Sequence, residues 1–181
     1  LIQDVLQPMR ALYLRMPAVA TLVLAVGAGY IIGGIRSALV VAALTLFIAL
    51  SPWWDRALVT LYMATFGVVI SCLIGFTVGT LCFQNKKSAA FMLGICDIFQ
   101  TFPSFVYLIP VMMLFGITDT SVLIAVIVYA TIPATRYTIE GLRSVPVGLH
   151  EAATMSGVNK FQRLTKIEFP LAFPHMMLGL N

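Results

Sequence analysis

Residues 57–83 read ALVTLYMATFGVVISCLIGFTVGTLCF, and none of these 27 residues is charged. At 1.5 Å per residue, a helix of this length can cross a hydrocarbon core of about 30 Å with some tilt. The run ends at Gln84-Asn85-Lys86-Lys87, a polar stretch of the kind found at a membrane surface. It therefore predicts a transmembrane helix, the clearest one in the chain.

The composition of the whole chain agrees with a membrane protein. Of its 181 residues, 60% are hydrophobic and 10% are charged, and the mean hydropathy is +0.99. Soluble domains are roughly 45–50% apolar and about 25% charged. Seven acids and eleven bases are too few to cover a water-exposed globule of this size, so lipid must solvate most of the surface. This excludes a secreted enzyme and a nucleic-acid-binding domain.

Two apolar segments precede the helix predicted over residues 57–83. Residues 17–34 are long enough for an ordinary transmembrane helix. Residues 37–51 are marginal for spanning, so they form either a short helix anchored at the interface by Trp53 and Trp54 or a re-entrant segment. We therefore treat residues 1–56 as N-terminal apolar segments and residues 57–181 as the transmembrane core.

The apolar pattern continues after this helix. Residues 88–116 include Pro103 and Pro110, and each proline removes a helix hydrogen bond, which predicts a kinked or broken helix. Residues 121–135 carry the chain back across the membrane. A further apolar stretch opens at Leu171 just before the sequence ends, so we expect a fragment of a longer protein. The predicted fold is all-α, a polytopic transmembrane bundle of about five spans with the last one truncated.

The basic residues predict the orientation of the spans. Lys86 and Lys87 lie two spans before the polar stretch 143–168, which carries four further Lys and Arg residues. The positive-inside rule places both regions in the cytoplasm. Counting back puts the N-terminus outside if both early segments cross. Arg10 and Arg15 would then lie on the wrong side, which favours a re-entrant second segment.

The titratable residues predict no metal or catalytic site. Cys72, Cys82 and Cys96 lie in or beside apolar segments without C-x-x-C spacing, and we interpret them as small core residues. Neither His150 nor His175 has a nucleophile at motif spacing. The chain contains no G-x-x-x-x-G-K-[ST] motif for ATP phosphates, so we predict that it binds no cofactor and is not an enzyme.

The polar stretch 143–170 predicts a helix, a turn and a second helix. Residues 149–156 can form two helical turns, Gly157 suits a left-handed C-terminal cap, and Asn159 with Gln162 resembles a capping pair. In the second helix an apolar stripe of Phe161, Leu164 and Ile167 adjoins a basic row of Lys160, Arg163 and Lys166. On this pattern alone, an amphipathic helix lying under lipid headgroups is the simplest interpretation.

The spacing of the residues in this stretch is more specific than its periodicity. Glu151, Ala152 and Ala153 are followed by Gly157 after three residues, by Ile167 after nine more, and by Pro170 at the end. This arrangement resembles the EAA loop of bacterial binding-protein-dependent ABC transporter permeases, with Phe169 where leucine is common. Upstream, residues 100–116 resemble permeases that import glycine betaine, proline betaine and choline. The resemblance covers roughly residues 57–181.

The resemblance implies that loop 143–170 couples the permease to a cytoplasmic ATPase. Its short helix would fit a groove on the ATPase, and nucleotide-driven closure of two ATPases would swing the permease from inward-facing to outward-facing. Small side chains permit close helix approach, and Glu151 offers a charged hydrogen-bond acceptor. Simple helix propensity plus a cap is the alternative explanation for the Ala and Gly residues. The candidate coupling residues are Glu151, Ala152, Ala153, Gly157, Ile167 and Pro170.

Polar and aromatic residues near Pro103 are candidates for the substrate pathway. Asp97 is the only acid in a predicted span, where an ionised group costs at least about 2.5–3.5 kcal/mol. It serves the substrate pathway, or it lies near the cytoplasmic interface or makes a structural hydrogen bond between helices. Aromatic faces attract quaternary ammonium, but they are also ordinary core and lipid-facing groups. Hydroxyl and amide groups can also satisfy the backbone freed by the proline. The candidates are Asp97, Gln100, Thr101, Phe102, Pro103, Phe105 and Tyr107.

The resemblance implies the permease subunit of an ATP-driven importer of quaternary or methylated ammonium compounds, such as glycine betaine, proline betaine, choline or carnitine. The implied location is the bacterial inner membrane. The implied partners are cytoplasmic ATPase subunits that bind ATP and Mg²⁺, an extracytoplasmic binding protein, a second permease copy and lipid. The alternative is an ATPase-independent secondary transporter or channel. Such a protein would need charged residues paired across spans, and in the sequence only Asp97 is available for this.

Overall fold

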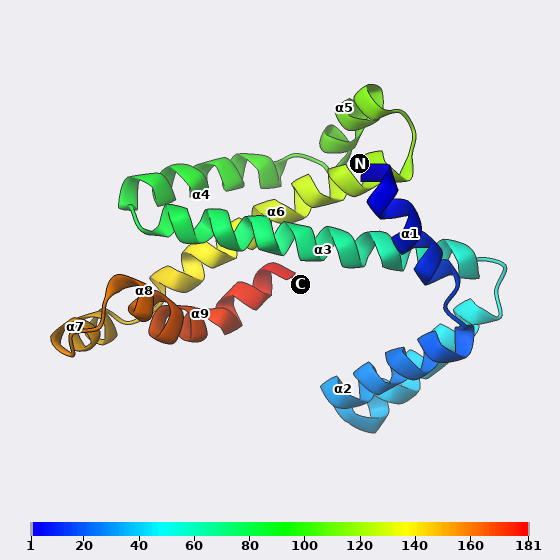
Figure 1. Cartoon of the computed structure of the whole chain (residues 1–181), viewed down its shortest axis with the longest axis horizontal. Coiled ribbons are helices and arrows are strands. Elements are labelled where there is room, and N and C mark those ends of the chain that lie inside the picture. The colour runs from blue at the N-terminus through cyan, green and yellow to red at the C-terminus, as the bar shows by residue number, and fades with distance from the viewer. Residues whose placement is uncertain (1, 181) are drawn as a thin grey trace. The chain divides into compact units, whose positions relative to one another are not determined.

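Two glycines break the long apolar helix near the N-terminus. In the computed structural model, which describes residues 2–180 and side chains from residue 7, α2 (Ala18–Ala49) is interrupted at Gly33 and Gly34. Gly34 has φ +68°, a conformation that side chains other than glycine rarely adopt. Figure 1 shows the two arms of α2 folded back on each other. The arms correspond to the two apolar segments expected before residue 57.

The α2 hairpin differs from the expected spanning helix over residues 17–34. Each arm is about 15 residues long, or about 22 Å, which is shorter than a hydrocarbon core of about 30 Å. A Cβ at Gly29 would lie 3.1 Å from a Val41 methyl, so the absent side chain lets the arms approach. A hairpin of two short arms has the form of a re-entrant segment, one of the two alternatives considered for residues 37–51. It lies with α1 (Ile2–Leu14) in the first of two compact units, Leu1–Thr65.

The second unit, Phe66–Asn181, is built around α6 (Asp119–Arg143). The boundary between the units falls within α3 (Trp54–Phe83). The remaining elements of the second unit are α4 (Lys86–Thr101), α5 (Phe105–Phe115), α7 (Val147–Met155), α8 (Lys160–Arg163), the π-helical η1 (Leu164–Glu168), α9 (Phe169–Met176) and the 3-10 turn η2 (Met177–Leu180). The helices α4, α5 and α9 and the turn η2 all contact α6. The structure is helical, with no strand in the part of the chain that it describes, so the predicted all-α fold is confirmed.

Three helices qualify as candidate spans, or four if a bent pair counts as one, although α2 qualifies only when its two arms are counted together. By length and composition these are α2, α3 and α6, together with the pair formed by α4 and α5, which bends by 86° at its break. The break lies at Phe102, Pro103 and Ser104, so the predicted broken helix over residues 88–116 is confirmed. The count is lower than the expected five because the first two apolar segments form a single hairpin.

Small residues bring α3 directly against α6. A Cβ built at Gly75 would lie 2.5 Å from the Ala134 Cβ and 2.9 Å from the Thr135 backbone nitrogen. One turn later, a Cβ at Gly79 would lie 2.6 Å from the Thr138 Cβ. Glycines four residues apart form the seam that membrane helices use for close packing. The backbone of α6 therefore leaves no room for a side chain at either position.

Gly75→Ala is therefore expected to lower the free energy of unfolding by about 1–3 kcal/mol, the usual cost of overpacking. Gly94→Ala is the matched control, because a Cβ at Gly94 meets nothing within 4 Å and alanine favours a helix over glycine by about 1 kcal/mol. Denaturant titration of the purified full-length protein in detergent measures both changes. Equal stability of the two variants would contradict the close packing of α3 on α6.

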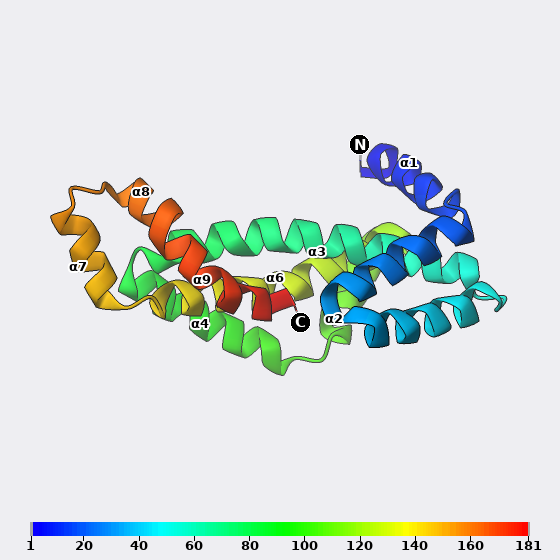
Figure 2. The same ribbon diagram turned by 90° about the horizontal axis from the view of Figure 1, so that it is seen from below.

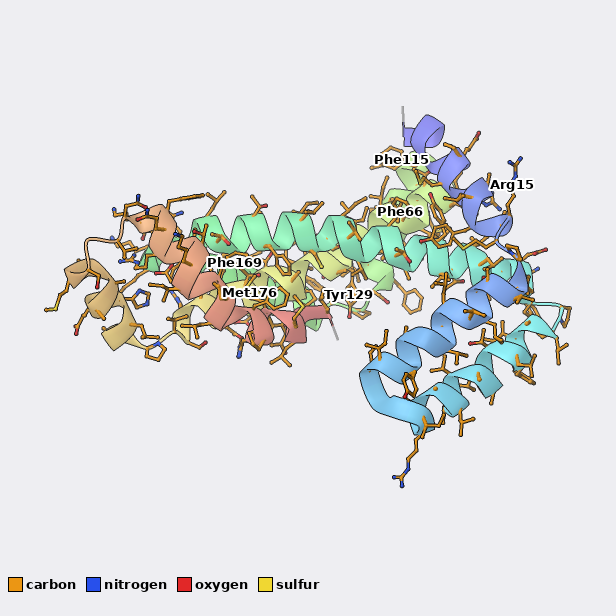
Figure 3. The ribbon with its side chains drawn as sticks, turned by 60° about the horizontal axis from the view of Figure 1, so that its bottom comes forward. Arg15, Phe66, Phe115, Tyr129, Phe169 and Met176 are labelled. Atoms are coloured by element: carbon orange, nitrogen blue, oxygen red, sulfur yellow. The ribbon has the colours of Figure 1, made fainter. Side chains whose placement is uncertain are left out.

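The C-terminal helix packs on the last turns of α6. The buried cluster consists of Leu142, Val145, Ala172 and Met176, with Phe76, Phe83, Leu164 and Phe169 packed around it. Figure 3 labels Phe169 and Met176 on the helix that carries this packed face. A Cβ at Gly141 would lie 3.1 Å from the Ala172 carbonyl oxygen, which keeps α9 close to α6. The segment that follows the polar loop is thus fixed to the central helix.

Candidate functional site

The polar loop lies at one end of the second unit, beside the turn between α3 and α4. Figures 1 and 2 both show α7 and α8 at this end. An Arg143 guanidinium nitrogen donates to the Lys86 carbonyl oxygen at 3.4 Å, which ties the end of α6 to the start of α4. The two basic regions therefore share one end of the unit, as expected if they lie on the same side of the membrane.

The turn between α7 and α8 has the geometry predicted from its residues. Gly157 has φ +71°, and its N–H donates to the Thr154 carbonyl at 3.1 Å. The next N–H, that of Val158, donates to the Ala153 carbonyl at 3.1 Å, which completes a Schellman cap. The Asn159 side chain then accepts from the Gln162 N–H at 2.8 Å, and the Gln162 side chain accepts from the Asn159 N–H at 3.2 Å. The predicted cap and capping pair are both confirmed.

The candidate coupling residues divide between an exposed and a packed side of the loop. On α7, Glu151 and Ala152 are exposed and Met155 is 91% exposed, whereas Ala153 is only 5% exposed. Gly157 and Pro170 are exposed, and Ile167 is half-buried in η1. The short helix α7 therefore presents a free face that carries a carboxylate, and packs through its small residue.

A buried carboxylate holds the loop together. The Glu168 side chain is 2% exposed, and its Oε1 accepts from the Arg163 Nε at 2.8 Å. The His150 Nδ1 lies 3.0 Å from the same oxygen. His150 belongs to α7 and Arg163 to α8, so one carboxylate joins the two short helices. We call these three residues the Glu168 clamp.

Sequence reasoning missed the Glu168 clamp. The sequence pattern placed Arg163 in the basic row of an amphipathic helix and gave Glu168 no role. The two residues are five apart, which puts them on different faces of an α-helix, but the segment Leu164–Glu168 is π-helical. The available signal was Glu168 itself, which is the one acid in the sequence after Glu151.

A cavity of about 420 Å³ opens beside the Glu168 clamp. Its walls come from the α3–α4 turn, from α7 and from α8, and include Phe83, Gln84, Lys160 and Phe161. The Phe161 side chain is 74% exposed, so the apolar stripe predicted for the second helix is not uniformly packed. All three clamp residues line this cavity together with the α3–α4 turn.

A second polar group joins α4 to α6. Arg136 donates to the Asp97 carboxylate and, at 3.1 Å, to the Gln100 side-chain oxygen. The Arg136 Nε also donates to Glu140 at 3.0 Å, one turn further along α6. The expectation that only Asp97 was available for pairing across spans is therefore wrong, because Arg136 pairs with it from another helix. This contact gives Asp97 a charged partner on another helix.

The aromatic candidates near the broken span differ in exposure. The Tyr107 side chain is buried, its hydroxyl donates to the Phe99 carbonyl, and its ring stacks on Phe99 with 5.9 Å between centroids. Phe102 and Phe105 are exposed, and Phe105 lines a cavity of about 180 Å³. Tyr107 thus packs inside the bend, whereas the two phenylalanines remain available to a substrate or a neighbouring subunit.

The remaining pathway candidates lie at the break itself. Thr101 donates through its hydroxyl to the Ile98 carbonyl at 2.7 Å, so it satisfies backbone at the end of α4. Pro103 is exposed between the two helices. Among residues 2–180 no group of three or more His, Cys, Asp or Glu side chains is placed to hold a metal ion. The side chains gathered at the break are charged, amide, hydroxyl and aromatic groups.

Comparison with known proteins agrees with this arrangement. Residues 67–180 match the family described as "Binding-protein-dependent transport system inner membrane component". Over its whole length the chain is 88% identical to the "Trimethylamine N-oxide transport system permease protein TmoV" of Pelagibacter ubique, and it covers 25% of that protein. Over 98% of its length the chain is also 44% identical to the protein of the same name from Ruegeria pomeroyi, of which it covers 27%.

A more distant relative is the "Glycine betaine/proline betaine transport system permease protein ProW" of Escherichia coli. It is 31% identical over 98% of this chain, which covers 50% of that protein. The chain thus spans between a quarter and a half of the length of these three relatives. The family match extends from the glycine seam of α3 through the whole polar loop to η2. The chain belongs to the family of binding-protein-dependent transport system inner membrane components, the ABC transporter permeases that its EAA loop resembles.

Proposed function

We propose that the protein carrying this chain is the permease subunit of an ATP-driven importer of small methylated amines. The permease role is supported by the family match over residues 67–180. The substrate class is supported by the names of the relatives, two of which specify trimethylamine N-oxide and a third glycine betaine and proline betaine. Because the 88% identical relative is a trimethylamine N-oxide permease, this compound is the first substrate to test. Glycine betaine, proline betaine, carnitine and choline follow, since they also carry a methylated nitrogen.

The observation that carries the proposal is the exposed face of α7, held at the end of the membrane helices by the Glu168 clamp. A short helix with an exposed carboxylate at Glu151 is suited to a groove on another protein, where it can accept charged hydrogen bonds. Loop 143–170 then lies in the cytoplasm and meets the ATPase, which binds ATP and Mg²⁺. An extracytoplasmic protein delivers the amine, and a second permease copy completes the membrane part.

The polar group formed by Asp97, Gln100, Arg136 and Glu140 suggests where the substrate pathway lies. Each charged group facing lipid in a spanning helix costs about 2.5–3.5 kcal/mol, so such groups face water or protein instead. The Asp97 side chain is nevertheless 60% exposed on the surface of this chain. We assign this face of α4 and α6 to the pathway or to the second permease copy that borders it. Its two carboxylates and one guanidinium leave a net negative charge, which suits the passage of a methylated cation or zwitterion.

A second candidate function is transport without an ATPase. The specific observation in its favour is the Asp97–Arg136 pair, because secondary transporters use charged residues that pair across spans. The EAA spacing and the exposed α7 face have no role in such a mechanism. The energy source of uptake therefore distinguishes the two functions.

The test is uptake by the full-length permease reconstituted in vesicles with its ATPase and binding protein. Radiolabelled trimethylamine N-oxide should enter only when ATP and Mg²⁺ reach the ATPase, and uptake should persist when the proton gradient is collapsed. Unlabelled glycine betaine, carnitine and choline, added in turn, rank the amines by competition. Uptake that follows an ion gradient without ATP would contradict the proposal and favour the second candidate.

A further inference from the structure

The Glu168 clamp connects the exposed short helix to the packed interior of the unit. Glu168 immediately precedes α9, whose residues Ala172 and Met176 are fully buried against α6. Because Gly141 on α6 has no side chain, the Ala172 carbonyl oxygen can come close: a Cβ built at Gly141 would lie only 3.1 Å from it. The Glu168 carboxylate also contacts α7, because the His150 Nδ1 lies 3.0 Å from its Oε1. The carboxylate thus stands between an exposed helix and a helix that α6 holds in place.

The clamp is suited to remain closed while α7 moves. Separation of α7 would take His150 away from a carboxylate that is 2% exposed, and a buried carboxylate that loses a close polar partner is penalised by desolvation. The adjoining segment Leu164–Glu168 is π-helical, a form that recurs at functional positions where a helix must bend. A push on α7 would therefore reach α9 through the carboxylate, with the π-helical segment as the compliant part.

We infer that Glu168 is a positioning residue that transmits displacement of α7 to α9 and α6 through His150. This inference rests on the proposed coupling function, since it names the residues that carry the displacement beyond the surface that meets the ATPase. Glu168 itself is buried and does not touch the ATPase. Arg163 orients the carboxylate from its own helix, while His150 makes the contact that crosses to α7.

The experiment measures uptake and ATP hydrolysis together in vesicles that contain the full-length permease, its ATPase and its binding protein. His150→Leu removes the polar α7 side chain that lies 3.0 Å from the carboxylate but leaves the Arg163–Glu168 pair. It should retain bound ATPase and continuing hydrolysis, while the amine transported per ATP falls about tenfold or more, the factor expected when a buried carboxylate loses a close polar partner. His150→Gln retains an N–H donor and should keep most of the wild-type ratio.

The matched control is Lys166→Gln, which removes an exposed charge from the same π-helical segment and should leave the ratio unchanged. A charge swap, Arg163→Glu with Glu168→Arg, restores the pair within the helix but faces His150 with a cation. Transmission through His150 predicts a low ratio for the swap, whereas recovery would show that the pair within the helix suffices and would overturn the inference.

Two further outcomes would also overturn the inference. One is a wild-type ratio in His150→Leu. The other is loss of assembled complex at an unchanged ratio, which would mark the clamp as a stabilising contact only. In both cases the wild-type permease still shows ATP-driven uptake, so these results would contradict the role of the clamp and not the proposed function. Absence of ATP-driven uptake in the wild-type vesicles would instead defeat the proposed function and the inference that rests on it.

Discussion

Gly157→Pro is expected to abolish amine uptake while the membrane helices stay folded. Proline fixes φ near −65°, whereas Gly157 has φ +71°, and proline removes the N–H that donates to the Thr154 carbonyl. The Schellman cap would be lost, and α7 would no longer be set at its angle to α8. Because α7 carries the exposed face proposed to meet the ATPase, uptake should fall to background. Vesicle uptake, normalised to the amount of permease, measures this.

Two alanine substitutions in the same loop separate backbone conformation from the loss of a glycine as such. A Cβ at Gly157 or at Gly148 meets nothing within 4 Å, so neither alanine introduces a clash. Only Gly157 has a positive φ, where alanine costs roughly 1–2 kcal/mol. Gly157→Ala should therefore reduce uptake partially, and Gly148→Ala should leave it unchanged. Wild-type uptake in Gly157→Pro would contradict the role of the turn.

Arg136→Met is expected to produce the second large loss. Without the guanidinium, Asp97 and Glu140 would face each other in two membrane helices with no cation between them. An unpaired charge in a spanning helix costs about 2.5–3.5 kcal/mol, a factor on the order of 100 in a folding equilibrium. Asp97→Asn should be milder, because Arg136 would keep Glu140 and Gln100 as partners. The amount of folded protein in the membrane, followed by normalised uptake, ranks the two variants.

A compensating variant distinguishes a structural role of this group from a role in the pathway. Arg136→Met combined with Asp97→Asn and Glu140→Gln removes all three charges, so the protein level should recover. If the group also attracts the amine, uptake per folded permease should remain low in this triple variant. Equal levels and equal uptake in Arg136→Met and the wild type would contradict any importance of the group.

The features that sequence reasoning predicted correctly depend on local signals. Asn159 and Gln162 are three residues apart, the spacing at which each side chain reaches the backbone of the other. Gly157 follows a short helix, where a positive φ is needed to end it. Pro103 predicted the broken span because proline cannot continue the hydrogen bonds of a helix. Such signals need no knowledge of distant parts of the chain.

The features that sequence reasoning missed depend on tertiary contacts or on a change of helical period. Asp97 and Arg136 are 39 residues apart, and only the packing of α4 on α6 brings them together. Arg163 and Glu168 share a face only because the segment between them is π-helical. The α2 hairpin is different, since the adjacent Gly33 and Gly34 were a turn signal that the sequence did offer.

The most direct test of the account is a photo-crosslink from α7 to the ATPase. A photoreactive phenylalanine analogue replaces Met155, whose side chain is 91% exposed on α7. The control position is Ile117, which is 87% exposed in the turn before the opposite end of α6. If α7 docks on the ATPase, position 155 should give a covalent adduct between permease and ATPase, and position 117 should give none. No ATPase adduct from position 155, or an ATPase adduct from position 117, would contradict it.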